Sequence, residues 1–334
     1  MNSNLLSRRT FLNRTSAVTA ALIGASSNHH AFALPTVDQL RIICGTPAGS
    51  VPDTVARHIA AHLASSYPRG VLVDNRPGAA GQIAINALKT APTDGSTVLL
   101  APDAVATIYP YIYSKLAYDP VLDLKPVSMA AEVTLGLAVG PAVPASVSNT
   151  SDFIEWMRRN PRLANVGSPG AGTPPHLLEA ILFRQLKVEW QHISYAGGPP
   201  AMTDLMSGQI AALVLPEGIL RQPRAAGKLR VLATSGAQRT VYLPDVPTLG
   251  EQGYSGIVMN DWFSFFMSGK VSQEVVDATS KLMRVAIAQP ELATAFSESG
   301  LVAVSSTPGA LAMRIASERR YWESAIRENG IRID

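Results

Sequence analysis

The ten residues Gly167–His176, GSPGAGTPPH, combine residue types that can hold an anion without a cationic side chain. Three glycines let backbone N–H groups approach a ligand closely. The threonine and prolines that follow can begin a helix, whose N-terminus carries positive partial charge and free N–H donors. Thr173 is a suitable N-cap residue, because its hydroxyl can accept a hydrogen bond from an N–H of the first turn. The pattern predicts an anion-binding loop.

Three further segments share this composition. Pro47–Asp53 reads PAGSVPD, Arg76–Gly81 reads RPGAAG and Tyr195–Pro200 reads YAGGPP, each after a strand-like run and before a helical pattern. In α/β sheets, ligands gather beyond the carboxyl ends of strands, where such loops lie. A few hydrogen bonds to a charged group, at about 1.5–3 kcal/mol each, would reach the roughly 8 kcal/mol of micromolar affinity. We therefore expect several of these loops to hold one small anion.

Patterns for phosphate binding and for catalysis are missing from the sequence. It has no GxxxxGK[ST] P-loop, no G-x-S-x-G elbow around Ser168 and no H-E-x-x-H or paired Cys/His spacing. His58 and His62 are four residues apart, and we interpret them as a solvated helix face rather than as metal ligands. His176 is either a ligand donor or a local structural group. An exported hydrolase that uses Ser168 and His176 is the alternative function.

Short apolar runs alternate with helical patterns along the chain, which favours an α/β fold with largely parallel sheets. One helical pattern covers Thr54–Ser65, and others surround Leu177–Leu182 and Met202–Met206. The expected strands are Leu40–Ile43, Val71–Val73, Thr97–Ala101, Leu135–Val139, Ala164–Gly167, Ala212–Leu215 and Leu229–Ala233.

The first residues resemble a bacterial export signal. Arg8 and Arg9 form a twin-arginine pattern, an uncharged apolar run follows, and Ala31–Ala33 reads as an A-x-A cleavage site. The apolar run is shorter than the ~20 residues of a membrane span. We expect a signal peptide over residues 1–33 and a mature protein in the periplasm.

Charge and cysteine content limit the partners. The chain has 28 Lys and Arg against 25 Asp and Glu, and the expected signal carries three of the arginines and no acid. A balanced mature chain without a basic stripe gives no support to a nucleic-acid partner. Cys44 is the only cysteine, so the chain cannot form an internal disulfide, and a buried structural thiol is expected.

Taken together, these segments resemble the Bug-type periplasmic solute-binding proteins of the tripartite tricarboxylate transporter class. The resemblance covers nearly all of the expected mature chain, and its motifs occur in a specific order. The segments that carry it are PAGSVPDTVAR (47–57), DNRPGAAG (74–81), AYDP (117–120), GSPGAGTPPH (167–176), YAGGPPAMTDLMSG (195–208), GKLRVLA (227–233) and LPDVPT (243–248).

The resemblance implies a two-domain type II periplasmic-binding fold, each domain a mostly parallel sheet flanked by helices. Residues 34–140 and 236–334 would form one domain and residues 141–235 the other, closing on a small carboxylate. A membrane transporter or a sensor would be the partner of a monomeric receptor without catalysis or cofactor. The implied ligand-binding positions are Ala48, Gly49, Ser50, Asp53, Ser168, Gly170, Ala171, Thr173, His176 and Tyr195.

The chain departs from the pattern of this class at several positions. Pro102-Asp103 follows a strand where small polar residues are usual, and Glu217 lies just beyond the expected position of another acid. Asp103 is either an exposed turn residue or a ligand-binding residue that faces the cleft. In the second case it would repel a second carboxylate, and we expect a monocarboxylate or an amino-acid-like ligand. Trp262 and Phe263 either belong to the core or line the cleft.

Overall fold

The computed structural model describes residues 37–333, so the expected export signal lies outside the described residues. The described chain is a mixed α/β structure built on one sheet. Its strands are β1 (Leu40–Cys44), β2 (Val71–Asn75), β3 (Thr97–Pro102), β4 (Leu124–Val139), β5 (Asn165–Ser168), β6 (Gln191–Ser194), β7 (Ala212–Pro216), β8 (Arg230–Thr234), β9 (Asn260–Ser268) and β10 (Val302–Ala303).

The α-helices follow most of the strands in the chain. They are α1 (Val51–Leu63), α2 (Gln82–Lys89), α3 (Ala104–Thr107), α4 (Tyr109–Ile112), α5 (Thr150–Arg159), α6 (Pro174–Gln185), α7 (Gly198–Ser207), α8 (Glu217–Ala225), α9 (Gln273–Ile287), α10 (Pro290–Glu298) and α11 (Pro308–Glu328). Within the described residues, no helix is both long and apolar enough to cross a membrane.

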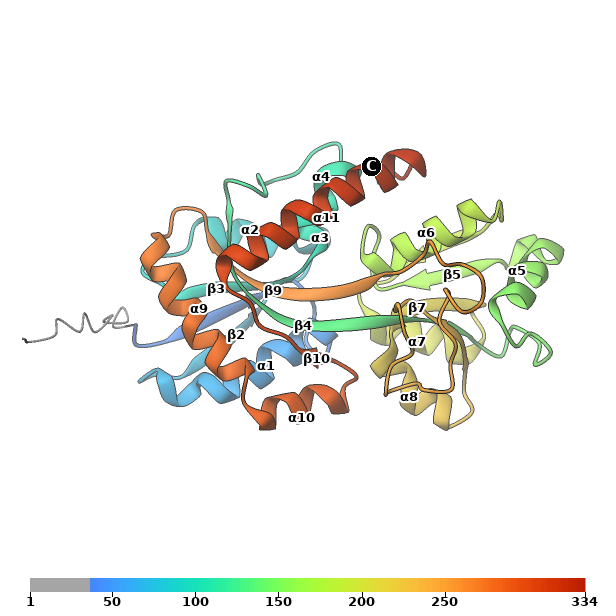
Figure 1. Ribbon diagram of the computed structural model, residues 1–334, viewed down its shortest axis with the longest axis horizontal. Helices are drawn as coiled ribbons and strands as arrows, with labels where there is room; N and C mark the ends of the chain where they lie inside the picture. The colour runs from blue at the N-terminus through green and yellow to red at the C-terminus, as the bar shows by residue number, and fades with distance from the viewer. Residues whose placement is uncertain (1–36, 334) are drawn as a thin grey trace, which may run out of the picture. The chain divides into compact units, whose positions relative to one another are not determined.

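The strand order is β2-β1-β3-β9-β4-β7-β5-β6, with β10 and β8 also paired to β4. Pairing is parallel among β1, β2 and β3 and among β5, β6 and β7, whereas β9 and β4 run antiparallel to their neighbours. Strand β4 belongs to both halves of the sheet, because residues up to Thr134 pair with β9 and residues from Leu135 pair with β7. Figure 1 shows β4 and β9 running between the two groups of strands.

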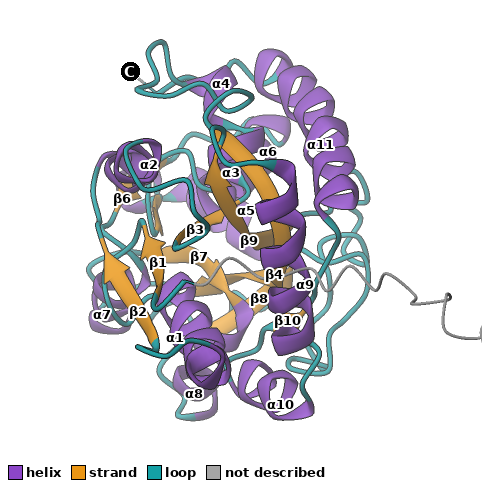
Figure 2. Cartoon of the chain, turned by 90° about the vertical axis from the view of Figure 1, so that its left-hand side faces the viewer, coloured by secondary structure: helices purple, strands orange, loops and turns teal. Residues whose placement is uncertain are grey.

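Helices cover both faces of the sheet in the half that contains β1 (Figure 2). Alternate side chains of each strand explain this arrangement, since successive residues point to opposite faces. Leu40 and Ile42 of β1 pack in one apolar cluster with Val55 of α1, while Ile43 packs in another with Ile85 of α2. Strands buried on both faces become nearly continuous apolar runs, which is why β1 and β3 could be recognised in the sequence.

The predicted strands and helices agree with the structure in position, with ends that differ by a few residues and with β4 longer than expected. Strands β6, β9 and β10 were not predicted. The division into domains at residues 140 and 236 stays a prediction; along β4 the change of pairing partner falls between Thr134 and Leu135.

Candidate functional site

A cavity of about 580 Å³ receives residues from both halves of the sheet. Loops that follow β1, β2, β5 and β6 form much of its wall, and residues of β3 and β9 form another part. The lining residues are Gly45, Thr46, Pro47, Gly49, Ser50, Val51, Pro52, Pro77, Gly78, Ala79, Ala80, Gly81, Leu99, Ala101, Pro102, Val105, Tyr109, Tyr113, Pro169, Gly170, Ala171, Thr173, Pro174, Pro175, Ser194, Tyr195, Ala196, Gly197, Gly198, Pro199, Met202, Leu215, Pro216, Ile219, Asp261 and Phe263.

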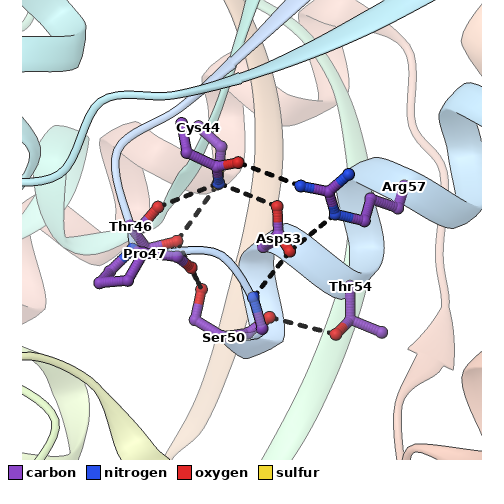
Figure 3. A network of polar contacts seen from close by, with 9 residues as sticks. Cys44, Thr46, Pro47, Ser50, Asp53, Thr54 and Arg57 are labelled. Atoms are coloured by element: carbon purple, nitrogen blue, oxygen red, sulfur yellow. Dashed lines mark hydrogen bonds and ion pairs between the residues drawn. The ribbon is translucent and has the colours of Figure 1, made fainter.

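The loop between β1 and α1 is held in shape by its own polar groups (Figure 3). Ser50 Oγ lies 2.7 Å from both Thr46 Oγ1 and Pro47 O. The Cys44 thiol lies 3.2 Å from the same threonine hydroxyl and is buried, as expected. Gly49 has a φ of +79°, a conformation that glycine adopts readily. These contacts position Ser50 at the N-cap of α1 beside the cavity.

Asp53 is the buried anchor of this loop. Its carboxylate accepts hydrogen bonds from Gly49 N at 2.8 Å, from Arg57 Nε at 2.9 Å and from Asn75 Nδ2 at 2.8 Å. Since Asn75 ends β2, Asp53 ties the first loop to the neighbouring strand. The carboxylate therefore orients the Gly49 N–H and does not itself line the cavity.

The turn Gly78–Gly81 enters the wall in a strained backbone conformation. Gly81 N donates to Gly78 O at 2.9 Å, while Ala79 and Ala80 have φ values of +46° and +53°. Left-handed conformations are unfavourable for alanine, and such strain is concentrated at functional sites. The turn ends at Gly81, the N-cap residue of α2.

The loop between β5 and α6 is the GSPGAGTPPH segment. Ala171 N donates to Ser194 Oγ at 3.0 Å, and Gly172 N donates to His176 Nδ1 at 3.1 Å. Thr173 is the N-cap residue of α6, as predicted, but its hydroxyl donates to Gly170 O at 2.7 Å instead of capping the first turn. The first turn of α6 is thus left without a side-chain cap on the cavity side.

Ser168 and His176 do not form a nucleophile and base. Ser168 is fully buried, and its Oγ lies 2.8 Å from His192 Nε2 and 3.1 Å from Gly170 O. The His176 ring stacks on His192 at 3.9 Å between centroids. Burial lowers the pKa of His192 to about 4 and, together with the neighbouring His192 ring, that of His176 to about 3. These groups brace the loop behind the wall, so the hydrolase alternative has no support in the geometry.

Tyr195 and Gly197 bring the third loop to the cavity. The Tyr195 hydroxyl donates to Asp204 of α7 at 2.8 Å, which fixes the ring in the wall. Gly197 N donates to Pro169 O at 3.1 Å and joins this loop to the GSPGAGTPPH segment. Gly197, with a φ of +106°, is the N-cap residue of α7.

The predicted site residues divide into two groups. Gly49, Ser50, Gly170, Ala171, Thr173 and Tyr195 line the cavity. Ala48, Asp53, Asp103, Ser168 and His176 are not part of the lining, although Asp53 and Ser168 form hydrogen bonds with the lining residues Gly49 and Gly170. Phe263 lines the cavity, whereas Trp262 is a core residue whose Nε1 donates to Glu318.

Several lining residues were missed because no local motif marks them, among them Tyr109, Tyr113 and Asp261. Tyr109 and Tyr113 come from the segment after β3, and Asp261 comes from β9, a strand distant in sequence. Glu217 lies outside this cavity. It lines a second one of about 290 Å³ and accepts from Thr240 Oγ1 at 2.8 Å, and burial raises its pKa to about 7.

Metal binding has no support in residues 37–333, where no cluster of three or more His, Cys, Asp and Glu could hold an ion. His62 Nδ1 lies 2.9 Å from the backbone oxygen of His58, and the His58 ring packs edge-on against Phe296. Both histidines are half-buried instead of fully solvated, and that they bind no metal stays a prediction.

The arrangement is an α/β fold with a partly open cavity and the N-termini of helices around it. Residues 55–331 match the family described as "Tripartite tricarboxylate transporter family receptor", and the chain belongs to this family. Proteins of this family are periplasmic solute-binding proteins.

Individual relatives agree with this assignment. The chain is 30% identical over 283 residues to the UPF0065 protein in the tcbD-tcbE intergenic region of Pseudomonas sp. strain P51, covering 84% of this chain and 83% of the relative. It is 28% identical over 298 residues to Protein BugT of Bordetella pertussis, covering 88% and 90%. A solved structure of R. palustris Rpa4515 with adipate has a TM-score of 0.83 and 26% identity, covering 88% of this chain and 98% of that chain. The Bug-type resemblance is confirmed.

Proposed function

We propose that this chain captures a small carboxylate in the 580 Å³ cavity and presents it to a membrane transporter or to a sensor protein. The observation that carries the proposal is the convergence of four helix N-termini. The N-cap residues of α1, α2, α6 and α7 are Ser50, Gly81, Thr173 and Gly197, and all four line the cavity without a side-chain cap bond.

The donors at these N-termini are backbone N–H groups. Val51 of α1 and Gly198 of α7 line the cavity, and their N–H groups have no partner among the described residues. The prolines at the starts of α1, α6 and α7 have no N–H group, so they donate no hydrogen bond, and their rings contribute apolar surface to the wall. No Lys or Arg belongs to the described lining. The site therefore fits one carboxylate with an apolar body, held by dipoles and a few N–H groups.

The location and the motion follow from the same proposal. The twin-arginine pattern at Arg8 and Arg9 supports export to the periplasm, although it lies outside the described residues. Two domains, 34–140 with 236–334 and 141–235, would close on the ligand through bending of the strands they share. The rise in affinity on closing would come from wall residues supplied by both halves of the sheet.

A substitution in the opening loop tests the proposal. Gly170 has no left-handed φ, and a Cβ there would meet only Thr173 Cγ2, at 3.3 Å, so Gly170→Val requires a small shift of that methyl group, and circular dichroism verifies that the variant folds. The valine side chain crowds the wall at the N-terminus of α6. In a thermal-shift panel of small carboxylates, including adipate, malate, succinate and benzoate, ligand should raise the melting temperature of wild type and leave that of Gly170→Val unchanged. Gly309→Val, with open space around its Cβ, is the control; equal stabilisation of all three proteins would reject the site.

A further inference from the structure

The cavity contains one charged side chain, and it is acidic. Among the described residues of the wall, only Asp261 has a carboxylate, and none has a cationic group. Asp261 is the second residue of β9 and is paired in register with Val133 of β4. It is 95% buried, and its Oδ1 has no hydrogen-bond partner within the described chain. A buried carboxylate with one oxygen that lacks a partner, in the wall of a ligand cavity, favours a positive charge beside it.

A second carboxyl group stands beside Asp261. Asp103 N donates to Trp262 O at 2.9 Å, which places Asp103 next to the start of β9. Asp103 is 1% exposed, and its Oδ1 also lacks a partner within residues 37–333. Asp103 is therefore the buried neighbour of the acid that lines the cavity.

Arg314, the cation whose charge acts on Asp103, is already paired with other acids. Arg314 of α11 forms ion pairs with Glu318, at 2.8 Å, and with Glu132 of β4, and its guanidinium lies over the Trp262 ring. Glu318 also accepts from Trp262 Nε1 at 2.9 Å. Arg314 is thus shared between Glu318 and Glu132, and it has no hydrogen bond or ion pair with Asp103 or Asp261 within the described residues.

The pKa values of Asp103 and Asp261 are both raised, as expected for buried acids without a cation beside them. Burial raises the pKa of Asp261 to about 7, and the charge of Glu318 adds to this effect against a backbone hydrogen bond from Trp262. Burial, followed by the charges of Asp261 and Glu318, raises the pKa of Asp103 well above its ordinary range. Tyr109, whose hydroxyl is affected by the charges of both acids, is neutral, since burial raises its pKa as well. A cation placed at Asp261 would favour the ionised form of both acids.

We propose that the ligand carries a cationic nitrogen in addition to its carboxylate, and that Asp261, with Asp103 behind it, receives this nitrogen. The ligand class is then an amino carboxylate instead of a dicarboxylate. This inference rests on the proposed function, because the helix N-termini hold the carboxylate end. It makes Asp261 the residue that determines specificity, by attracting one distal group and repelling the other.

Matched ligand pairs test the inference by calorimetry and thermal shift. Each pair shares a skeleton and differs in one distal group: glutarate with 4-aminobutanoate, adipate with 5-aminopentanoate, and terephthalate with 4-(aminomethyl)benzoate. Wild type should prefer the amino member of the pair that it binds best. Asp261→Asn should reduce binding of that member by about tenfold or more and improve binding of the dicarboxylate. Asp38→Asn, at an exposed position, is the matched control and should keep the wild-type ranking.

The pH dependence distinguishes an ionised Asp261 from a protonated one. Binding of the amino member should strengthen between pH 5.5 and pH 8 in wild type and not in Asp261→Asn. A dicarboxylate held by a protonated Asp261 would show the opposite trend, and that trend overturns the inference. An unaltered ranking in folded Asp261→Asn, verified by circular dichroism, also overturns it while leaving carboxylate capture intact. If wild type binds no member of any pair but is stabilised by malate or benzoate, the inference fails and carboxylate capture stands.

Discussion

Asp53 is the residue on which the geometry of the first loop depends. Although burial acts to raise its pKa, hydrogen bonds from Arg57, Gly49 and Asn75 outweigh burial and hold the pKa of Asp53 below its ordinary value. A carboxylate with a depressed pKa contributes stability above its unfolded pKa, about 3.9, and this contribution is lost as pH falls through the lower folded pKa.

We predict that Asp53→Asn lowers the free energy of unfolding by about 1–3 kcal/mol at pH 7, because the Gly49 N–H and Arg57 lose their charged acceptor. The difference from wild type should shrink between pH 5 and pH 3. Urea denaturation at each pH measures it, with exposed Asp38→Asn as the control. Equal stability of Asp53→Asn and wild type at pH 7 would show that Asp53 does not anchor the loop.

Ala80 is the second residue with a measurable prediction. Its φ of +53° is unfavourable for alanine, so Ala80→Gly should raise the free energy of unfolding by up to about 1 kcal/mol after the entropy of the unfolded chain is included. Ala87→Gly, within helix α2, should instead lower it by roughly 0.5–1 kcal/mol. A loss of stability in Ala80→Gly similar to that in Ala87→Gly would mean that the turn is not strained.

At the scale of elements, Gly218 of α8 packs directly against the backbone of Ser299 and Gly300, which follow α10. A Cβ on Gly218 of α8 would stand 1.8 Å from Ser299 O, and Gly300, with a φ of +67°, lies on the other side of the contact. We predict that Gly218→Ala destabilises the protein by at least about 1–3 kcal/mol, because no rotamer change can relieve a backbone clash. Gly256→Ala, with open space around its Cβ, should be near neutral in the same thermal denaturation. A neutral Gly218→Ala would show that α8 can move away freely.

Elements could be predicted where one segment carries the whole signal. The continuous apolar run of β1 and the spacing of Val55, Ile59 and Leu63 in α1 are local patterns, and the structure confirms both elements. Strand β9 was missed, although Trp262 and Phe263 were recognised as apolar. It pairs antiparallel with β3 and β4, so it is not part of the repeated strand–helix–parallel strand pattern by which the other strands were recognised.

The same limit applies to the site. Loops that combine glycine and proline before a helix can be recognised in the sequence, so Ser50, Gly170 and Thr173 could be proposed as site residues. Asp261 could not, since it enters the cavity only because β9 returns to pair with β3, more than 150 residues away in sequence. Asp103 could be proposed as a site residue because it follows β3. Since β3 pairs with β9, the neighbouring acid Asp261 lines the cavity and Asp103 does not.

For the whole molecule, the export route gives a prediction about the precursor. Replacing Arg8 and Arg9 together by lysine should keep the precursor in the cytoplasm, since the paired arginines are the feature that identifies a twin-arginine signal. Cell fractionation and immunoblotting of the double variant measure this against the wild-type precursor. Normal accumulation of the variant in the periplasm would contradict the twin-arginine route without affecting the binding site.

The central claim is that four helix N-termini hold a small carboxylate in the cavity. The most direct measurement is mass spectrometry of small molecules released by denaturing freshly purified protein, run in parallel on Gly170→Val. The account predicts one released carboxylate, close to one per protein molecule in wild type and strongly depleted in the variant. A released molecule without a carboxylate, or the same molecule at equal occupancy in Gly170→Val, would contradict it.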